Sequence, residues 1–236
     1  MRNILAKLFH GTIGRAIARV REIWFSQKLR NTQDGLYKVS PEPVYTSQLA
    51  NARRGKIQGF YEAINDQEAA KRFGAANLEE FSYWAWRSCG MVGVQMVLKA
   101  QLRHKFTKST MDLVNEGLSI GGYEEKHDKG WRHSALAQIA QRHGMASRLS
   151  KFVPSAQVAE LVLEGNYVLA SVKSERGGHL LLIWGVRIKN GKVISFMVHD
   201  PNNFAEDGDS KEVSKVSFEN LFTRRIVTFE NIQKND

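Results

Sequence analysis

Cys89, the only cysteine in the chain, stands where a cysteine can act as a nucleophile. A thiol attacks as its thiolate, and a free thiol is mostly protonated at neutral pH unless its surroundings favour the anion. The apolar residues Met91, Val92, Val94, Met96, Val97, Leu98 and Leu102 predict a largely buried helix with Cys89 in its first turn. The unpaired backbone N–H groups of a first turn favour an anion. Gly90, directly after the thiol, would leave room for a substrate backbone. The alternative is that Cys89 only packs in the core, the commoner use of a lone buried cysteine.

His179 is the candidate partner of this thiol, because it opens an apolar strand directly after a glycine pair. The dipeptide Asn190-Gly191 predicts a two-residue hairpin turn of the primed type. Counting back from that turn puts Asn202 opposite His179 and Asp200 diagonal to it. Because side chains alternate along a strand, all three are expected on one face of the sheet.

A carboxylate beside the imidazole would fix its tautomer and stabilise the imidazolium that pairs with a thiolate. We expect Asp200 to have this role. Asn202 is the alternative orienting residue, because an amide can orient a histidine and a one-residue bulge would turn Asp200 to the other face. His199 is expected to point away from the group. The residues from Asp200 to Asn203 also favour a turn after a strand on their own account.

Acyl transfer through such a cysteine also needs hydrogen-bond donors for the oxyanion, ordinarily the backbone N–H of the nucleophile and one side chain. No glutamine stands in the residues just before Cys89. Tyr83 and Trp84 are the candidate donors there. Either one can equally serve aromatic packing beside a cleft, so the second donor stays open.

The elements that must position these residues have an α+β pattern. Apolar residues at helical spacing predict helices at Tyr61–Phe73, His133–His143 and Ser155–Leu163, and glycines follow the last two. Runs rich in β-branched residues predict strands at Tyr167–Val172, His179–Ile188, Lys192–His199 and Arg225–Phe229. The expected architecture is a helical part that carries the nucleophile, packed on an antiparallel sheet that carries the histidine and the aspartate.

Composition narrows the setting of this domain. A chain of 236 residues with 42% hydrophobic residues can bury one full core. A single cysteine excludes an intrachain disulfide and a cysteine-built zinc site. The chain has no run of about 18 apolar residues and no apolar signal core at its start, so the cytoplasm is the expected location. No cofactor is expected.

The first 30 residues differ from the rest of the chain in their charge. They hold seven Lys and Arg residues against the single acid Glu22, in a chain of formal net charge +10. Apolar residues at three- and four-residue intervals over 3–26 predict a basic amphipathic helix, and the polar stretch that follows predicts a linker. We therefore divide the chain into residues 1–40 and a catalytic domain of residues 41–236. The helix is expected to lie at an anionic membrane surface, to act as a targeting segment, or to dock on its own domain or on a partner protein, and these alternatives stay open.

Metal and nucleic-acid sites have little support in the sequence. His127, Asp128 and His133 match no familiar metal-binding spacing, so no metal site is expected. The N-terminal arginines can contact phosphates, but no nucleic-acid recognition motif accompanies them. No specific nucleic-acid partner is therefore expected.

With these residues identified, the chain resembles the bacteriocin-processing, double-glycine leader peptidase family of the papain-like cysteine peptidases. The resemblance is closer to stand-alone members that are not fused to transporters. The matching segments follow one another in the family's order between about residues 80 and 230, and they are Arg87–Leu98, Trp131–Gly144, Asn166–Val172, Gly177–Gly185, Val198–Asn202 and Val216–Phe222.

The resemblance implies a papain-like fold, with Cys89 as the nucleophile, His179 as the general base and acid, and Asp200 as the orienting residue. It also implies a peptide or protein substrate that contains glycine. The family has a glutamine six residues before the cysteine, where this chain has Tyr83. Residues 1–40 match nothing in the family.

Three functions are consistent with these residues. The leading hypothesis is a hydrolase that cleaves a peptide or amide bond through a thioester on Cys89. An acyltransferase would keep the thioester and pass the acyl group to an amine. A non-catalytic pseudo-peptidase would keep only the peptide-binding cleft, with Tyr83 marking a lost oxyanion donor.

Overall fold

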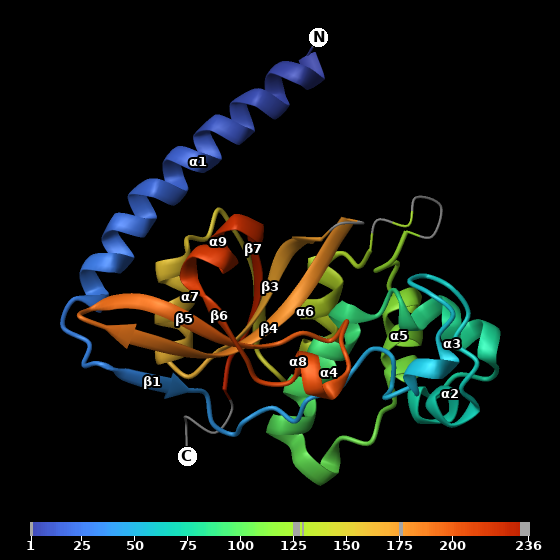
Figure 1. Ribbon diagram of the computed structural model, residues 1–236. Helices are drawn as coiled ribbons and strands as arrows, with labels where there is room; N and C mark the ends of the chain where they lie inside the picture. The colour runs from blue at the N-terminus through green and yellow to red at the C-terminus, as the bar shows by residue number, and fades with distance from the viewer. Residues whose placement is uncertain (1, 125–127, 129, 175–176, 232–236) are drawn as a thin grey trace.

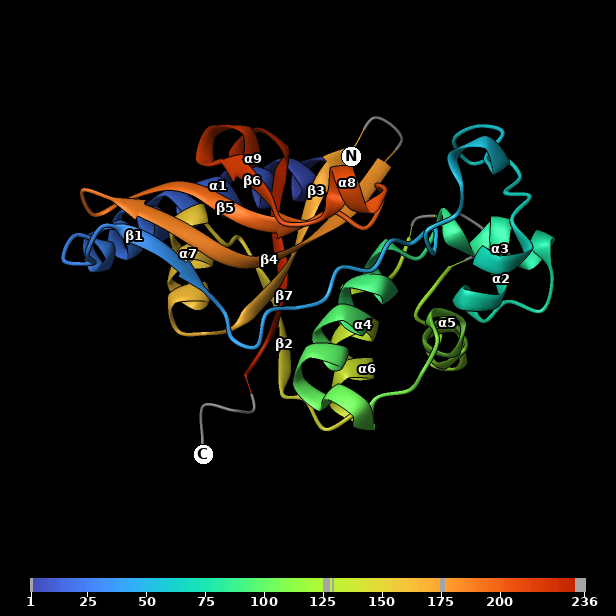
Figure 2. The ribbon, with the colours of Figure 1, turned by 60° about the horizontal axis from the view of Figure 1, so that its bottom comes forward.

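The fold is known from a computed structural model that describes residues 2–124, 128, 130–174 and 177–231, without the side chains of residues 2–12 and 15. Figures 1 and 2 show helices packed around a twisted sheet. The α+β class expected from the sequence is therefore confirmed.

The sheet brings together strands from both ends of the chain. Within the described residues its strands follow the order β2-β7-β3-β4-β5-β6, β1 pairs with β4, and every pairing is antiparallel. The strands are β1 (Gly35–Lys38), β2 (Ser147–Lys151), β3 (Tyr167–Ser174), β4 (Gly177–Lys189), β5 (Lys192–His199), β6 (Lys211–Ser214) and β7 (Phe222–Phe229). The four strands predicted from the sequence correspond to β3, β4, β5 and β7, whereas the short strands β1, β2 and β6 have no clear pattern.

The hairpin of β4 and β5 sets the register of the candidate site. Asn190 and Gly191 both have positive φ, at 50° and 64°, as the primed turn requires. The register shifts once between Arg187 and Ile188 and again between Ile183 and Gly185. The two shifts cancel, so that Leu182 pairs with His199 in the register predicted from the turn alone.

The helices form two groups in Figures 1 and 2, with α2–α5 gathered to one side of the sheet and α1, α7 and α9 near its other end. Helix α4 also contacts α6, β3 and β4. The helices are α1 (Arg2–Leu29), α2 (Gln67–Phe73), α3 (Leu78–Ala85), α4 (Cys89–Leu102), α5 (Thr110–Ser119), α6 (His133–Arg142), α7 (Ser155–Leu163), α8 (Ala205–Gly208) and α9 (Lys215–Leu221), with short 3₁₀ turns at η1 (Arg54–Lys56) and η2 (Arg103–Lys105).

The helix predicted over Tyr61–Phe73 is wrong in its first half. Helix α2 begins only after Asp66, whose side chain accepts a hydrogen bond from the backbone N–H of Ala69 and so caps the helix. Tyr61 has a positive φ of 65°, and Ile64 forms an isolated bridge with Ile57. The segment before the cap is therefore held by a turn and a bridge.

Helix α1 and the predicted linker are part of the packed structure. Helix α1 contacts α7, and Figure 1 shows its N-terminal part extending beyond the domain. Residues 35–38, expected in a linker, form β1 and pair with β4. No helix within the described residues is long and apolar enough to cross a membrane.

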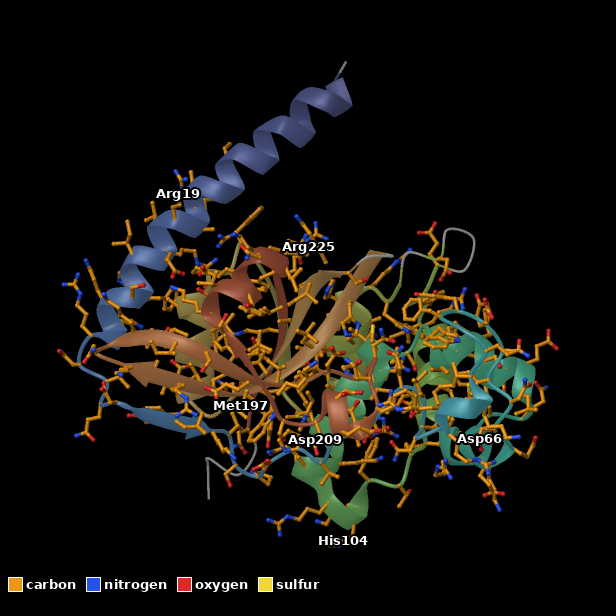
Figure 3. All side chains as sticks on the ribbon, viewed as in Figure 1. Arg19, Asp66, His104, Met197, Asp209 and Arg225 are labelled. Carbon is orange, nitrogen blue, oxygen red and sulfur yellow. The ribbon has the colours of Figure 1, made fainter. Side chains whose placement is uncertain are left out.

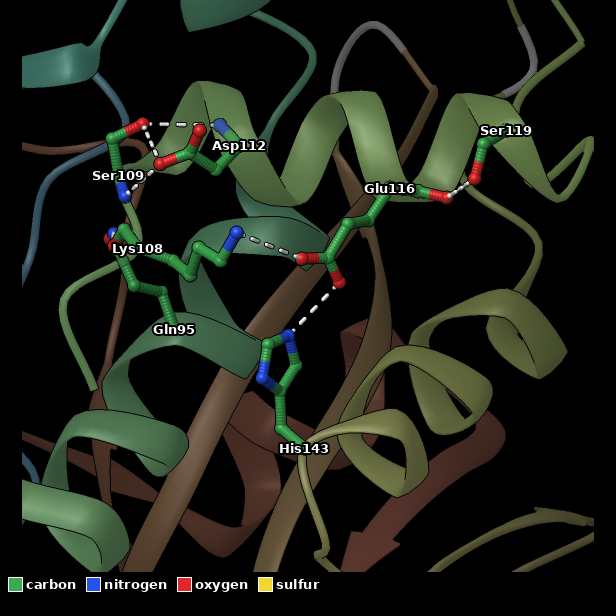
Figure 4. A network of polar contacts seen from close by, with 7 residues as sticks. All are labelled: Gln95, Lys108, Ser109, Asp112, Glu116, Ser119 and His143. Carbon is green, nitrogen blue, oxygen red and sulfur yellow. Dashed lines mark hydrogen bonds and ion pairs between the residues drawn. The ribbon is translucent and has the colours of Figure 1, made fainter. Parts of the chain in front are cut away.

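A polar network joins α5 to the end of α6 (Figure 4). Ser109 and Asp112 form a reciprocal capping box at the N-terminus of α5. On the same helix, Oε2 of Glu116 lies 2.9 Å from Nε2 of His143, which follows α6. Because α4 packs against both helices, the network supports the helix that carries Cys89.

Candidate active site

Cys89 is the first residue of α4, as the sequence predicts, and its side chain is partly exposed. Ser88 precedes it as the N-cap residue, but the Ser88 hydroxyl is directed to the carbonyl oxygen of Ala85 and caps no helix N–H. Because the first-turn N–H groups of a helix have no intrahelical partners, they remain available to a negative charge beside the sulfur.

Two glycines let α4 approach the sheet closely. A methyl group on Gly90 would crowd the side chains of Leu136 and Leu180, and one on Gly93 would overlap Leu169. The expectation that Gly90 leaves room for a substrate backbone is therefore wrong, because the space beside it is filled by α6 and β4. Because Gly90 and Gly93 have no side chains, α4 lies close to β3 and to β4, the strand that carries His179.

The structure brings His179 and Asp200 into direct contact. Nε2 of His179 lies 2.7 Å from Oδ1 of Asp200, and both side chains are largely buried. Asp200 follows directly after β5, on the face predicted from the hairpin register. With Nε2 engaged by Asp200, Nδ1 is the ring nitrogen available to Cys89.

The charge state of His179 is set by three opposing influences. Burial disfavours the imidazolium, but hydrogen bonds and electrostatic interactions with Asp200 and Cys89 outweigh burial and raise the pKa of His179 to about 10. Burial likewise opposes the charge of Asp200, whose pKa is nevertheless lowered by its hydrogen bond to His179 and by the charge of that ring. The group therefore favours an imidazolium held between two acidic partners.

Asp200 is held in place by groups that the sequence does not reveal. Its Oδ1 accepts a hydrogen bond from the backbone N–H of Asn202 (3.2 Å), and its Oδ2 accepts one from the Asn203 amide (2.7 Å). The hydroxyl of Tyr45 donates to the Asp200 carbonyl oxygen at 2.9 Å. The side chain of Asn202, the alternative orienting residue, turns instead to Gln48, whose amide donates to it at 2.7 Å.

Cys89 opens into a cleft of about 320 Å³. Three glycines form part of its wall and leave space for a ligand backbone, while aromatic rings and an arginine close other sides. The lining residues are Tyr61, Trp86, Arg87, Cys89, Tyr123, Asp128, Gly130, Gly177 and Gly178. Arg87 donates two hydrogen bonds of 3.0 and 2.7 Å to Asp128, which joins Asp128 to the residues just before the thiol.

The structure does not bring Tyr83 and Trp84 to the wall of this cleft. The Tyr83 ring packs against the Arg87 guanidinium, 4.1 Å from its carbon to the ring centroid, and lines a separate hollow of about 520 Å³. The buried Trp84 ring packs against Tyr123 and Trp131. In this conformation both residues support the segment beside the cleft.

Of the residues considered for a metal site, the structure describes Asp128 and His133. His127 lies outside the described residues, Asp128 is bound by Arg87, and burial lowers the pKa of His133. In the part of the chain that the structure describes, no group of three His, Cys, Asp or Glu side chains is placed to hold a metal ion.

Comparison with known proteins finds similar folds among solved structures. No protein-family model matches the sequence, and no curated protein does. The peptidase domain of Streptococcus ComA, a bi-functional ABC transporter involved in quorum sensing, shares 16% identity at a TM-score of 0.43, over 61% of this chain and 90% of that one. A C39-like peptidase from Bacillus anthracis shares 15% identity at a TM-score of 0.45, over 61% and 88%. A double-glycine-motif protease from an AMS/PCAT transporter, solved with its leader peptide, shares 16% identity at a TM-score of 0.41, over 61% and 84%.

Proposed function

We propose that this chain is a cysteine-nucleophile hydrolase that cleaves a peptide or amide bond, with Cys89 as nucleophile, His179 as acid and base, and Asp200 as orienting residue. One observation carries the proposal. The largely buried His179 ring bonds to a carboxylate through Nε2 and interacts with the only thiol of the chain, beside an open cleft. A cysteine that only packed in the core would need neither the imidazole nor the cleft.

The chemistry follows from the positions of these groups. His179, as the imidazolium, holds the proton of the thiol, and the Cys89 sulfur attacks the substrate carbonyl carbon to give a tetrahedral oxyanion. The C–N bond then breaks as His179 returns the proton to the leaving amine, which leaves a thioester on Cys89. A water molecule, deprotonated by His179, attacks the thioester, and the carboxylic acid departs as the sulfur recovers its place beside the imidazolium. Asp200 keeps Nδ1 turned to the sulfur throughout.

The backbone N–H of Cys89 is the oxyanion donor that the structure supports best, since it lies in the first turn of α4 without a side-chain cap. Tyr83 and Trp84 remain proposed side-chain donors, and either would have to leave its present aromatic packing to reach the cleft. Replacing Tyr83 by phenylalanine keeps the ring against Arg87 and removes only the hydroxyl. A loss of about 10²-fold or more in kcat for Tyr83→Phe would identify the hydroxyl as the second donor, and retention of the activity would exclude it.

The proposed substrate is a peptide or protein with glycine at the cleavage site. The glycines of the cleft wall leave open space, in which a peptide backbone can lie close to Cys89. The double-glycine protease described above is bound to a leader peptide, and we propose a substrate of that kind here. We also propose that the enzyme acts in the cytoplasm, where its only cysteine stays reduced.

Gly178 offers a direct test of the cleft. Its φ is not in the left-handed region, and a side chain there would meet open space, so Gly178→Leu should fold normally and fill the cleft. We expect a sharp rise in KM for a glycine-containing peptide, with thiol reactivity retained. Gly55→Leu is the matched control, because Gly55 has equally open surroundings and lies on η1, outside the cleft lining. Equal KM values for the two variants would exclude this cleft as the substrate site.

The proposal as a whole is tested with iodoacetamide and a glycine-containing peptide library. At neutral pH we expect Cys89 to be alkylated faster than N-acetylcysteine, His179→Ala to lose this advantage, and Cys89→Ala to cleave no peptide. If Cys89 is alkylated only as fast as the free thiol and the wild type cleaves no peptide, the proposal that the chain is an enzyme is wrong. Peptide binding by both the wild type and Cys89→Ser without cleavage would then indicate the non-catalytic module, and amide products formed with added amines would indicate the acyltransferase.

A further inference from the structure

Helix α1 is fixed to the domain by one of its faces. Ala18, Phe25 and Leu29 are buried, and α1 packs against α7. On the same side, Glu22 accepts a hydrogen bond of 3.1 Å from the backbone N–H of Ala156 and forms an ion pair of 2.9 Å with Lys215. The helix cannot rotate about its axis without breaking these contacts, so the direction of its other faces is set.

A second face of α1 is apolar and exposed. Its side chains follow helical spacing, and their exposed fractions are 46% for Ile13, 40% for Ile17, 68% for Val20, 62% for Ile23 and 52% for Trp24. These are five of the fourteen exposed large hydrophobic side chains in the described residues, all within one stretch of the helix. Such a contiguous apolar face in water marks an interaction surface.

Positive charge borders this face. Arg19 and Arg30 are exposed, and the Lys28 ammonium stands 4.0 Å from the Trp24 ring centroid while it also pairs with Glu160. Figure 3 shows Arg19 on α1 and Arg225 on the upper side of the domain in that view, the side from which α1 extends. Glu22 is the only acid among residues 1–30, and it pairs with Lys215 on the side of α1 that faces the domain. It therefore does not neutralise the exposed arginines.

We infer that the exposed face of α1 lies in the interface of an anionic phospholipid bilayer. Isoleucine, valine and tryptophan side chains would enter the acyl region, while the bordering cations meet the phosphates, which is how basic amphipathic helices bind membranes. A second copy of the chain would instead bring the same cations against one another. The inference does not depend on the proposed activity.

This contact would orient the whole protein at the membrane. Because α1 is anchored through Ala156 on α7 and Lys215 on α9, the domain would be held at a fixed angle to the bilayer instead of trailing from a flexible tether. Since no described helix is able to cross the bilayer, the inferred contact is with its surface.

Vesicle sedimentation of the full chain tests the inference. The lipids are phosphatidylcholine alone and an equal mixture of phosphatidylcholine and phosphatidylserine. We expect binding to the mixed vesicles that weakens as salt is raised, and little binding to phosphatidylcholine alone. Val20→Glu should lower the partition coefficient by at least about tenfold. Val216→Glu, on α9, is the matched control, because Val216 has the same 68% exposure, and it should bind as the wild type does.

Trp24 gives a local readout of the same contact. Brominated lipids should quench tryptophan fluorescence in the wild type and lose that effect in Trp24→Phe. Equal binding of the wild type and Val20→Glu to mixed vesicles, or equal binding of the wild type to both lipids, would overturn the inference. A wild-type dimer that Val20→Glu converts to a monomer in the absence of lipid would overturn it too, in favour of self-association.

Discussion

His179 and His199 lie on neighbouring strands of one sheet, yet their surroundings give them opposite properties. Leu182, three residues after His179, pairs with His199, so the two rings emerge on opposite faces. His179 sits between a carboxylate and a thiol beside a cleft. His199 is almost fully buried, and its ring stacks on Trp184.

The partners of the two rings explain the difference. Nε2 of His199 donates to the Pro43 carbonyl oxygen at 2.8 Å, and Nδ1 accepts from the backbone N–H of Ser210 at 3.1 Å. One nitrogen donates and the other accepts, which is the pattern of a neutral imidazole. Burial lowers the pKa of His199 despite a nearby carboxylate at Asp209, whereas the acidic partners of His179 raise its pKa to about 10. The partners of a histidine therefore decide whether it is suited to proton transfer, and burial beside an aspartate is not enough.

The largest expected effect is the difference in activity between a variant that lacks the His179 ring and one that lacks the His199 ring. His179→Gln should lower kcat/KM by about 10³-fold or more, because the group that exchanges the proton is gone. His199→Gln should keep its activity at temperatures where it remains folded. Steady-state cleavage of a glycine-containing peptide measures both, with circular dichroism as the check on folding. A folded His199→Gln that lost activity as severely would contradict the division of roles.

The two aspartates sharpen the comparison further. Asp200→Asn removes a charge that raises the pKa of His179, so the alkaline limb of the pH–rate profile should move to lower pH, and kcat should fall by about 10²-fold or more. Asp209→Asn, the matched change beside His199, should leave the profile in place. Rates measured across the pH range for both variants check this. An unmoved alkaline limb in Asp200→Asn would mean that Asp200 does not set the charge of His179.

The parts of this site that follow from local sequence could be predicted. The helix that begins at Cys89 is rich in apolar residues, and Asn190-Gly191 has the turn chemistry that fixes the hairpin and thus brings Asp200 near His179. The two register shifts in the hairpin were not predictable, because bulges depend on how both strands pack on their neighbours. The prediction holds at the site because the shifts compensate each other.

The parts that depend on distant residues could not be predicted. Tyr45 and Gln48 reach the turn after β5 across more than 150 positions, and nothing in their own neighbourhood indicates it. The apolar stripe of α1 misled in another way. Its spacing predicts a helix correctly, but the helix docks through Ala18, Phe25 and Leu29, which are not part of that stripe, and Val20 stays exposed. Periodicity identifies an apolar face, while packing decides which face is covered.

The smallest expected effect is the contribution of His199 to stability. Because burial lowers the pKa of His199 in the folded state, the unfolded chain takes up a proton more readily below about pH 6.5, and folding stability should fall as the pH drops through that range. His199→Gln should be less stable at neutral pH by about 1–3 kcal/mol, since Pro43 and Ser210 lose buried partners. Its stability should also depend less steeply on pH than that of the wild type, because the protonation that opposes folding has been removed.

Urea unfolding at a series of pH values between neutrality and mild acid measures both quantities. His104→Gln is the control, since His104 is exposed and its replacement should leave the free energy of unfolding at neutral pH unchanged. The two histidines of the sheet should also differ in direction. The stability that His179 contributes is present below about pH 6.5 and is lost only as the pH rises through about 10, because its folded-state pKa is raised. If the free energy of unfolding falls equally steeply toward acid pH in the wild type and in His199→Gln, protonation of His199 does not oppose folding. The two histidines would then differ in their partners and positions but not in how they link stability to pH.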